Sequence, residues 1–302
     1  MTVQIIDFDA GNEILSWSGL LDAFAKGHQL PKAEIGDTFL YRDPDTMLSR
    51  SAWIDGLGVA VKTATIFPGN VQSGAPAING SVSLFSDDDG SLEAMLDFHL
   101  ITKWKTAGDS LYAASLLANP DAERILIVGT GAVAGNMVGA YRSVFPAAQI
   151  SVWGRNRVNC DRFAEAHGVQ AVQDLEASVG EAHIICTATM STEPVIKGDW
   201  LQPGQHLDLI GAYRPDMREV DDTALQRAKI FVDSFATTLD HIGELKIPLS
   251  SGAIGRESVI ADFYTPDAFQ RDADDITICK NGGGAHLDLM TCRHLLDLWN
   301  AR

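Results

Sequence analysis

The chain has 302 residues, of which 46% are hydrophobic, so it is long enough to form two domains with full cores. Its formal net charge of −17 argues against a general nucleic-acid binder or a protein of anionic membrane surfaces, because no basic patch offsets the repulsion. The first residues do not form an export signal and no run approaches the ~18 apolar residues of a membrane span, so a cytoplasmic protein is expected.

The first third of the chain has the pattern of antiparallel strands. Residues 38–41, 58–67 and 81–85 are rich in β-branched and aromatic side chains and are bounded by turn sequences such as Asp87-Asp-Asp-Gly90. A helix is expected over residues 102–118, ending before the turn at Asn119-Pro120. We therefore expect an α+β domain over residues 1–118.

From about residue 120 onwards, strands and helices alternate. Short apolar runs predict strands at 125–128, 150–153, 183–186, 206–210 and 230–232, with helices at 132–145 and 157–167. This alternation predicts a doubly wound parallel sheet of the Rossmann type over residues 119–284. A last helix is expected over residues 285–300, where apolar side chains recur at helical spacing.

The turn after the first of these parallel strands carries a glycine motif. In the sequence Gly129-Thr-Gly131-Ala132-Val133-Ala-Gly135, backbone N–H groups at a helix N-terminus can approach a pyrophosphate. Glycine-rich turns also occur for structural reasons alone, but the preceding strand, the following helix and the next strand all agree with a dinucleotide site. We expect cofactor contacts from Gly129, Gly131, Ala132 and Val133.

The end of the second parallel strand indicates which dinucleotide binds. An NAD site usually has Asp or Glu here, whereas this chain has Arg155-Asn156-Arg157. The two guanidinium groups suit the 2′-phosphate of NADP, so NADPH is expected to be preferred, with NADH possible. The alternative is that one or both arginines are solvated at a helix start. Thr187 and Thr189 follow the third strand, where small hydroxyl side chains suit a nicotinamide ribose.

Neither a disulfide framework nor a metal site is indicated. The four cysteines are widely spaced, which favours reduced thiols. No zinc or calcium motif is present, and His206-Leu-Asp208 is more typical of a strand than of a metal site.

Six segments, in the same order, resemble the family of ornithine cyclodeaminase, mu-crystallin and archaeal alanine dehydrogenase. They are residues 58–62 with 65–70, residues 101–107, the glycine motif, residues 189–194, residues 211–221 and residues 281–288. The resemblance implies a homodimer in which the N-terminal domain, completed by residues 285–302, binds both the partner and the substrate. It also implies NAD(P)H chemistry at the imine or amino carbon of a small 2-imino acid.

The same resemblance suggests how the substrate is held. Lys62 matches the lysine that contacts the substrate carboxylate, and a lysine beside a hydride acceptor can also donate a proton. Its position in an apolar run favours this role over that of a solvated strand lysine. Lys105 stands where the family usually has arginine, and loses that group's two-pronged geometry. Lys32 is expected to be a further carboxylate ligand, with Arg42 and Arg50 as competitors.

Other expected contacts lie within the matching segments. We expect cofactor contacts from Thr106, Asn156, Gly211, Tyr213 and Asn281, and substrate contacts from Arg214 and Gly282.

Tyr213 bears on the reaction type. In cyclodeaminases the corresponding position carries an aspartate that assists amine chemistry, and this chain has Gly211-Ala-Tyr213 instead. The chain therefore resembles most the ketimine reductase branch, which converts pyrroline-2-carboxylate or piperideine-2-carboxylate to L-proline or L-pipecolate. Ornithine cyclodeamination or alanine dehydrogenation remains an alternative. A non-catalytic NADPH-binding protein of the mu-crystallin type is a second alternative, kept open by Lys105 and Ala77.

Overall fold

The computed structural model describes residues 2–302, apart from the side chain of Val71. The chain forms two compact units: residues up to Lys105 with Gly284–Arg302, and Thr106–Gly283. The helix α3 (Phe98–Leu117) passes from the first unit into the second, so the division falls inside this helix rather than at its end, where the sequence suggested a linker. The last helix, α10 (Ala285–Asn300), belongs with the first unit.

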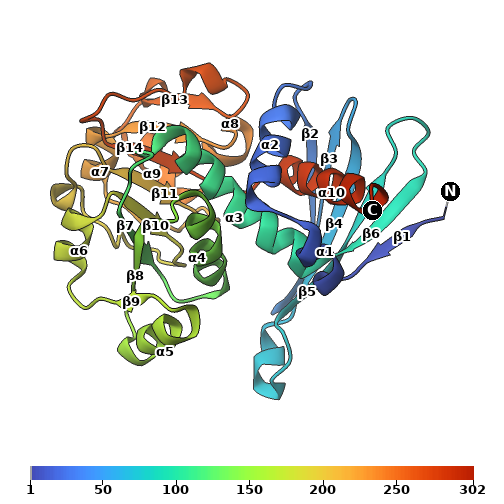
Figure 1. Cartoon of the computed structure of the whole chain (residues 1–302), viewed down its shortest axis with the longest axis horizontal. Helices are drawn as coiled ribbons and strands as arrows, with labels where there is room; N and C mark the ends of the chain where they lie inside the picture. The colour runs from blue at the N-terminus through green and yellow to red at the C-terminus, as the bar shows by residue number, and fades with distance from the viewer. Residues whose placement is uncertain (1) are drawn as a thin grey trace. The chain divides into compact units, whose positions relative to one another are not determined.

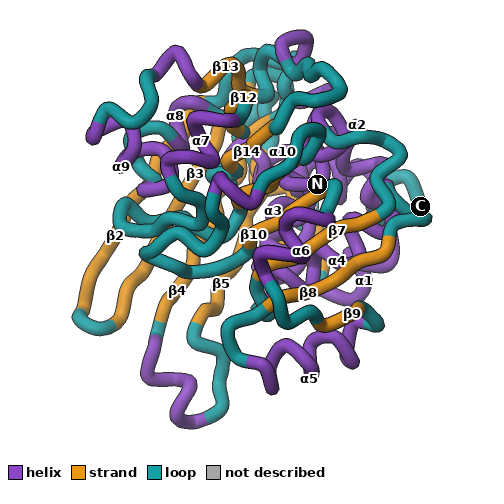
Figure 2. Tube along the Cα trace, turned by 90° about the vertical axis from the view of Figure 1, so that its left-hand side faces the viewer, coloured by secondary structure: helices purple, strands orange, loops and turns teal. Residues whose placement is uncertain are grey.

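The first unit is built on a six-stranded sheet, shown with its helices in Figure 1. The strand order is β1-β6-β5-β4-β3-β2, and all neighbours are antiparallel except β1 and β6. The strands are β1 (Gln4–Ile6), β2 (Glu34–Arg42), β3 (Asp45–Ile54), β4 (Gly58–Ile66), β5 (Ile78–Phe85) and β6 (Leu92–Asp97). The 3-10 turn η1 (Pro68–Ser73) lies at the tip of the β4–β5 hairpin, which extends away from the helices of this unit (Figure 2).

One face of this sheet is covered by helices and the other is not. The helix α10 packs against β3, β4 and β5, where Ala52, Ala60 and Leu84 are buried, and α1 (Phe8–Ile14) and α2 (Trp17–Gly27) pack against α10. Alternate residues face the opposite way. On that second face Ile5, Trp53 and Met95 are all exposed. This sheet face thus has large apolar side chains open to solvent in the single chain.

The second unit is a parallel sheet with the order β13-β12-β14-β11-β10-β7-β8-β9. The order reverses at β7, which pairs with both β8 and β10, and this is the switch point of a doubly wound fold. Figure 2 shows β7, β8 and β9 side by side. The strands are β7 (Arg124–Val128), β8 (Gln149–Trp153), β9 (Gln170–Ala171), β10 (Ile184–Thr187), β11 (His206–Leu209), β12 (Lys229–Val232), β13 (Val259–Asp262) and β14 (Thr277–Lys280).

Side chains at the helix ends explain several of the helix bounds in this unit. Asn156 accepts a hydrogen bond from the backbone N–H of Asn159 and begins α5 (Arg157–His167), and Gly168 ends this helix in a left-handed conformation with φ of 60°. Asp174 and Asp221 cap two further helices in the same way. The remaining elements are α4 (Ala132–Val144), α5 (Arg157–His167), α6 (Leu175–Glu181), α7 (Asp222–Arg227), α8 (Phe235–Thr238), α9 (Gly243–Ser251), η2 (Gly198–Trp200), η3 (Arg256–Ser258) and η4 (Pro266–Ala268).

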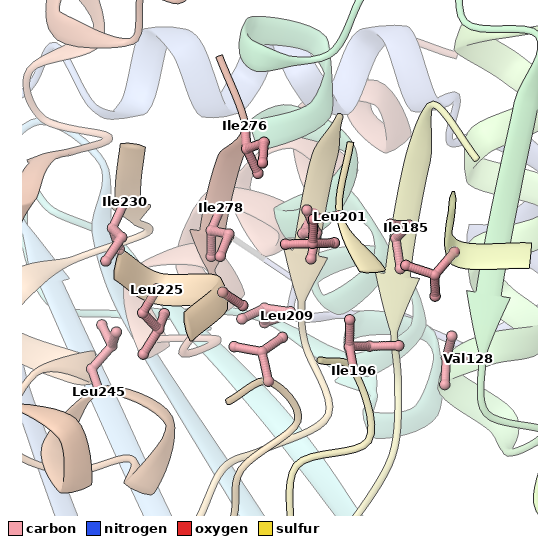
Figure 3. Close-up of a cluster of buried hydrophobic side chains, with 14 of the residues drawn as sticks. Val128, Ile185, Ile196, Leu201, Leu209, Leu225, Ile230, Leu245, Ile276 and Ile278 are labelled. Atoms are coloured by element: carbon pink, nitrogen blue, oxygen red, sulfur yellow. The ribbon is translucent and has the colours of Figure 1, made fainter. Parts of the chain in front are cut away.

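The core of the second unit lies between its sheet and these helices. Figure 3 shows Ile185, Leu209 and Ile278 on neighbouring strands, packed with Ile196, Leu225 and Leu245 from the segments that cover them. The four cysteines are free thiols and all are buried, as expected for structural cysteines. Among the helices described, none is long and apolar enough to cross a membrane.

Candidate functional site

The glycine motif forms the expected turn at the end of β7. Gly129 has φ of 130°, a conformation that favours glycine. A Cβ atom on Gly129 would lie 2.6 Å from the carbonyl oxygen of Ala188, so the turn closely approaches the segment after β10. This close packing brings two strand ends together at the switch point.

The start of α4 has room for a ligand. Gly131 is the N-cap of α4 and makes no side-chain cap, and a Cβ atom placed on it would have no neighbour within 4 Å. Ala134, in the third glycine position of the motif, is fully buried, as close packing of helix on strand requires. Ala132 is exposed and Val133 half-buried at the same helix end. The first-turn N–H groups of α4 therefore suit the pyrophosphate of a dinucleotide.

The two arginines after β8 differ in their surroundings. Arg157 makes a two-pronged ion pair with Asp161, with distances of 2.9 Å from Nε and 2.7 Å from Nη2. Arg155 is exposed, and within residues 2–302 its side chain has no ion pair. Asn156 uses its side-chain oxygen as the N-cap of α5. Of the two guanidinium groups, Arg155 is thus the one that keeps its donors available.

The segments after β10 and β11 lie against each other. A Cβ atom on Gly211 would lie 2.2 Å from both the backbone nitrogen and oxygen of Thr189, so only glycine fits there. Thr187 is fully buried at the end of β10, and its hydroxyl has no hydrogen-bond partner among the described residues. An unsatisfied buried hydroxyl at this strand end fits a site that takes a polar ligand.

The other residues expected at the cofactor and substrate have varied environments. Tyr213 is 59% exposed, and Arg214 makes two hydrogen bonds of 2.9 Å to Asp216 at the surface. The Asn281 amide donates to Ser110 Oγ at 2.9 Å, so it also fastens the end of β14 to α3. Gly282 and Thr106 are half-buried.

In the first unit, Lys62 is buried on β4 and forms an ion pair. Its Nζ lies 2.9 Å from Oδ1 of Asp288, in the first turn of α10, and the two side chains are 8% and 1% exposed. The same Nζ lies 4.9 Å from the centre of the Phe98 ring. A buried lysine paired in this way is not a solvated strand residue.

Further cations surround this pair. Burial alone would raise the pKa of Asp288, but the charges of Lys62, Lys105 and Arg50 outweigh it, so its pKa is lowered. Arg50 faces Lys62 across the β3–β4 register and also pairs with Asp37 at 2.8 Å. Lys105 is buried.

His286 lies in the same cluster and is neutral. Its pKa is lowered to about 3 by burial, and further by the charges of Lys105, Lys32 and Arg50. Its ring meets that of His28 edge to face, with centroids 5.3 Å apart. Lys105 and Arg50 thus act on both His286 and Asp288, while Lys32 acts on His286 and Lys62 on Asp288. Arg42 is different, because it pairs with Asp45 and is exposed.

Sequence reasoning gave no role to Asp288 or His286. Both lie in a segment that matched the family, and both sit among apolar residues of a helix, which is the signal of a buried polar group. Among residues 2–302, no group of three or more His, Cys, Asp or Glu side chains could hold a metal ion.

The comparison with family models decides the assignment. Residues 45–301 match the model of the ornithine cyclodeaminase/mu-crystallin family. The chain belongs to this family. Its Rossmann unit and its α+β unit, with the last helix returning, are the expected fold, and the family's dinucleotide cofactor is NAD(P).

Individual relatives agree with the family assignment. The chain is 48% identical to a Delta(1)-pyrroline-2-carboxylate reductase of Paracoccus denitrificans over 97% of this chain and 96% of that protein. The structure of the Thermococcus litoralis Delta(1)-pyrroline-2-carboxylate reductase, in complex with NADH and L-proline, matches with a TM-score of 0.89 at 22% identity, covering 99% of this chain and 98% of that one. An archaeal alanine dehydrogenase dimer with bound NAD also matches with a TM-score of 0.89, at 25% identity, covering 100% and 97%.

Proposed function

We propose that this protein reduces a cyclic ketimine carboxylate with NAD(P)H. The substrates are pyrroline-2-carboxylate or piperideine-2-carboxylate, and the products L-proline or L-pipecolate. The observation that carries the proposal is the buried Lys62–Asp288 pair with Lys105 and Arg50 acting on the same carboxylate, because several basic side chains around one point suit a small carboxylate ligand. The 48% identity to a pyrroline-2-carboxylate reductase supports the same substrate class.

The residues of the first unit have separate roles in this proposal. Lys105, with Lys32 or Arg50, binds the substrate carboxylate, and Lys62 lies at the imine. Reduction adds a hydride to the imine carbon and one proton to the nitrogen, and the Lys62 ammonium is the proton donor. Asp288 orients that ammonium through its 2.9 Å hydrogen bond. Water then returns a proton to Lys62.

The second unit binds the cofactor in this proposal. NAD(P)H, when bound, supplies the hydride from C4 of its nicotinamide. The N-terminus of α4 holds the pyrophosphate, and the segments after β10 and β11, with Thr187, Thr189 and Gly211, bind the nicotinamide end. Arg155 binds the 2′-phosphate, which makes NADPH the preferred cofactor.

We further propose a homodimer that uses the uncovered sheet face. Ile5 and Met95 are partners in the β1–β6 register, and Trp53 lies on β3 of the same sheet, so this face exposes large apolar side chains, which is typical of a protein–protein interface. The dimeric state of the matching archaeal alanine dehydrogenase supports this assembly.

A panel assay tests the proposed reaction. Oxidation of NADPH and of NADH is followed at 340 nm with pyrroline-2-carboxylate, piperideine-2-carboxylate and pyruvate plus ammonia, and ornithine is tested with NAD. We expect turnover with a cyclic ketimine, loss of that turnover in Lys62→Ala, and unchanged NADPH binding in this variant. Inactivity towards both cyclic ketimines would overturn the proposal. Formation of proline and ammonia from ornithine would instead establish a cyclodeaminase.

A further inference from the structure

Glu219 is a fully buried carboxylate that lies outside every role described above. It follows the segment after β11, two residues before the N-cap of α7. Its charge is not neutralised by a lysine or arginine within hydrogen-bond distance among the described residues, so the groups that do contact it must satisfy it.

Four donors converge on this carboxylate, from two different segments. Oε1 accepts hydrogen bonds from the backbone N–H and the hydroxyl of Thr189, at 2.7 and 2.8 Å. Oε2 accepts from the backbone N–H groups of Gly211 and Ala212, at 2.8 and 3.1 Å. Each oxygen therefore serves one segment, and the carboxylate joins the chain after β10 to the chain after β11.

These two segments could not be held together by their own side chains. Gly211 has none, and a Cβ atom on it would also lie 2.4 Å from Oε1 of Glu219. The register of β10 with β11 ends at Thr187 and Leu209, and the backbone N–H groups of Ile210 and Gly211 still donate to the carbonyl oxygen of Thr187, at 3.0 and 3.2 Å. The Glu219 carboxylate extends this connection to Thr189 and Ala212, which the backbone hydrogen bonds to Thr187 do not reach.

Glu219 is itself held in place by a second buried carboxylate. Glu244, in the first turn of α9, accepts from the backbone N–H of Glu219 at 2.7 Å and from that of Val220 at 3.0 Å. The carbonyl oxygen of Glu219 accepts from Val195 and Ile196, both at 2.9 Å. A fixed backbone on both sides makes the carboxylate a rigid point of attachment.

We propose that Glu219 is a positioning residue for the cofactor site, which sets the distance between the segments that carry Thr189 and Gly211. This inference rests on the proposed function, since it takes these segments to bind the nicotinamide end. A glutamine at this position can accept at one end of its amide only, and its NH₂ group would face the N–H donors of one segment. One of the two segments would then lose its hydrogen bonds to this side chain.

Glu219→Gln is compared with a matched control, Asp221→Asn. Asp221 also accepts hydrogen bonds from two backbone N–H groups of this unit, those of Gly198 and Ala224, but it does not contact Thr189 or Gly211. Loss of either carboxylate weakens the fold, so the thermal unfolding midpoint is measured for both. NADPH binding is measured by nicotinamide fluorescence, and amide hydrogen exchange is followed at residues 188–191 and 210–213 without cofactor.

We expect Glu219→Gln to raise the Kd for NADPH about tenfold or more and to speed exchange in one or both segments. Asp221→Asn should lower the unfolding midpoint by a similar amount but change the Kd for NADPH by less than about twofold, because the Glu219 carboxylate still joins the segments of Thr189 and Gly211 in this variant. If Glu219→Gln does not fold, Glu219→Asp, which keeps both oxygens on a shorter side chain, is compared with the same control.

Equal NADPH affinity in the Glu219 variant and wild type, or equal weakening in the Asp221 variant, would overturn the positioning role. A wild-type protein that binds neither NADPH nor NADH would instead overturn the proposed function. The two failures are therefore distinguishable.

Discussion

Lys62 and Asp288 lie 226 positions apart in the sequence, yet their side chains form a buried ion pair at 2.9 Å. The pair joins the middle of a strand to the first turn of the last helix, which belongs to the same unit. A buried ion pair is costly to break, because the remaining charge loses its partner away from water. It therefore fixes both the ammonium and the helix start.

Replacement of Asp288 by asparagine should impair both stability and catalysis. The variant leaves the Lys62 ammonium buried beside a neutral amide, which should lower the free energy of unfolding by about 3 kcal/mol. We expect kcat/KM for the ketimine to fall about a hundredfold, because the proton donor is no longer oriented. Denaturant unfolding and steady-state kinetics measure the two effects.

Glu93→Gln is the control for this prediction. Glu93 pairs with Arg293, also on α10, but does not contact Lys62. Its loss should cost stability and leave kcat/KM within about twofold of wild type. If Asp288→Asn also kept wild-type kcat/KM, Asp288 would be a structural residue only.

Cofactor preference should depend on Arg155 and not on Arg157. Arg155→Ser should lower kcat/KM for NADPH about tenfold and leave that for NADH nearly unchanged, because only NADPH carries the 2′-phosphate. Arg157→Ser is the matched variant, since Arg157 already pairs with Asp161. Kinetics with both cofactors measure the ratio. An unchanged ratio in Arg155→Ser would show that the phosphate is bound elsewhere.

Local patterns in the sequence predicted the second unit well. The helix Arg157–His167 was expected with these bounds, because Asn156 and Gly168 are strong start and stop signals. The glycine motif was predictable for the same reason, because its strand, turn and helix follow one another directly in the sequence. Parallel strands buried on both faces also give clear apolar runs.

The first unit was harder to predict for physical reasons. β2 is exposed on both faces, so polar and apolar residues do not alternate along it. Of its residues Glu34–Arg42, only 38–41 were expected to form a strand. β1 pairs only with β6, and in parallel, so no hairpin turn marks β1. The Lys62–Asp288 and Glu219–Thr189 contacts depend on the folded backbone, and residue spacing gives no signal for them.

The assembly state should respond to a charge on the uncovered sheet face. Met95→Lys places an ammonium among the exposed apolar residues of this face, beside Ile5 in the β1–β6 register. We expect the dimer to dissociate, with a mass near the 32.5 kDa of one chain in light scattering after size exclusion. Ile260→Lys, at an exposed apolar position of the second unit, should leave the mass unchanged. A monomeric wild type would contradict the proposed interface.

Stability should depend on pH through Glu244. Burial and the charge of Glu219 raise the pKa of Glu244 to about 7, although Lys280 lowers it in part. In the unfolded chain the same group titrates near 4.5. Between these two values the folded protein holds a proton that the unfolded chain has lost. The contribution of Glu244 to stability is therefore full below about pH 4.5 and is lost as the pH rises through about 7.

Glu244→Gln carries no titratable group and should not show this loss. We compare the thermal unfolding midpoint of this variant with that of the wild type at each pH. The difference between them should grow by roughly 5 °C in favour of the variant from pH 5 to pH 8, because the free energy of unfolding of the wild type falls by about 3 kcal/mol over this range. The exposed Glu257→Gln controls for the change in net charge and should follow the wild type at every pH. If the unfolding midpoints of wild type and Glu244→Gln changed with pH in parallel, Glu244 would keep its charge in the folded protein. Lys280 and the backbone N–H groups would then stabilise Glu219 and Glu244 as two carboxylates.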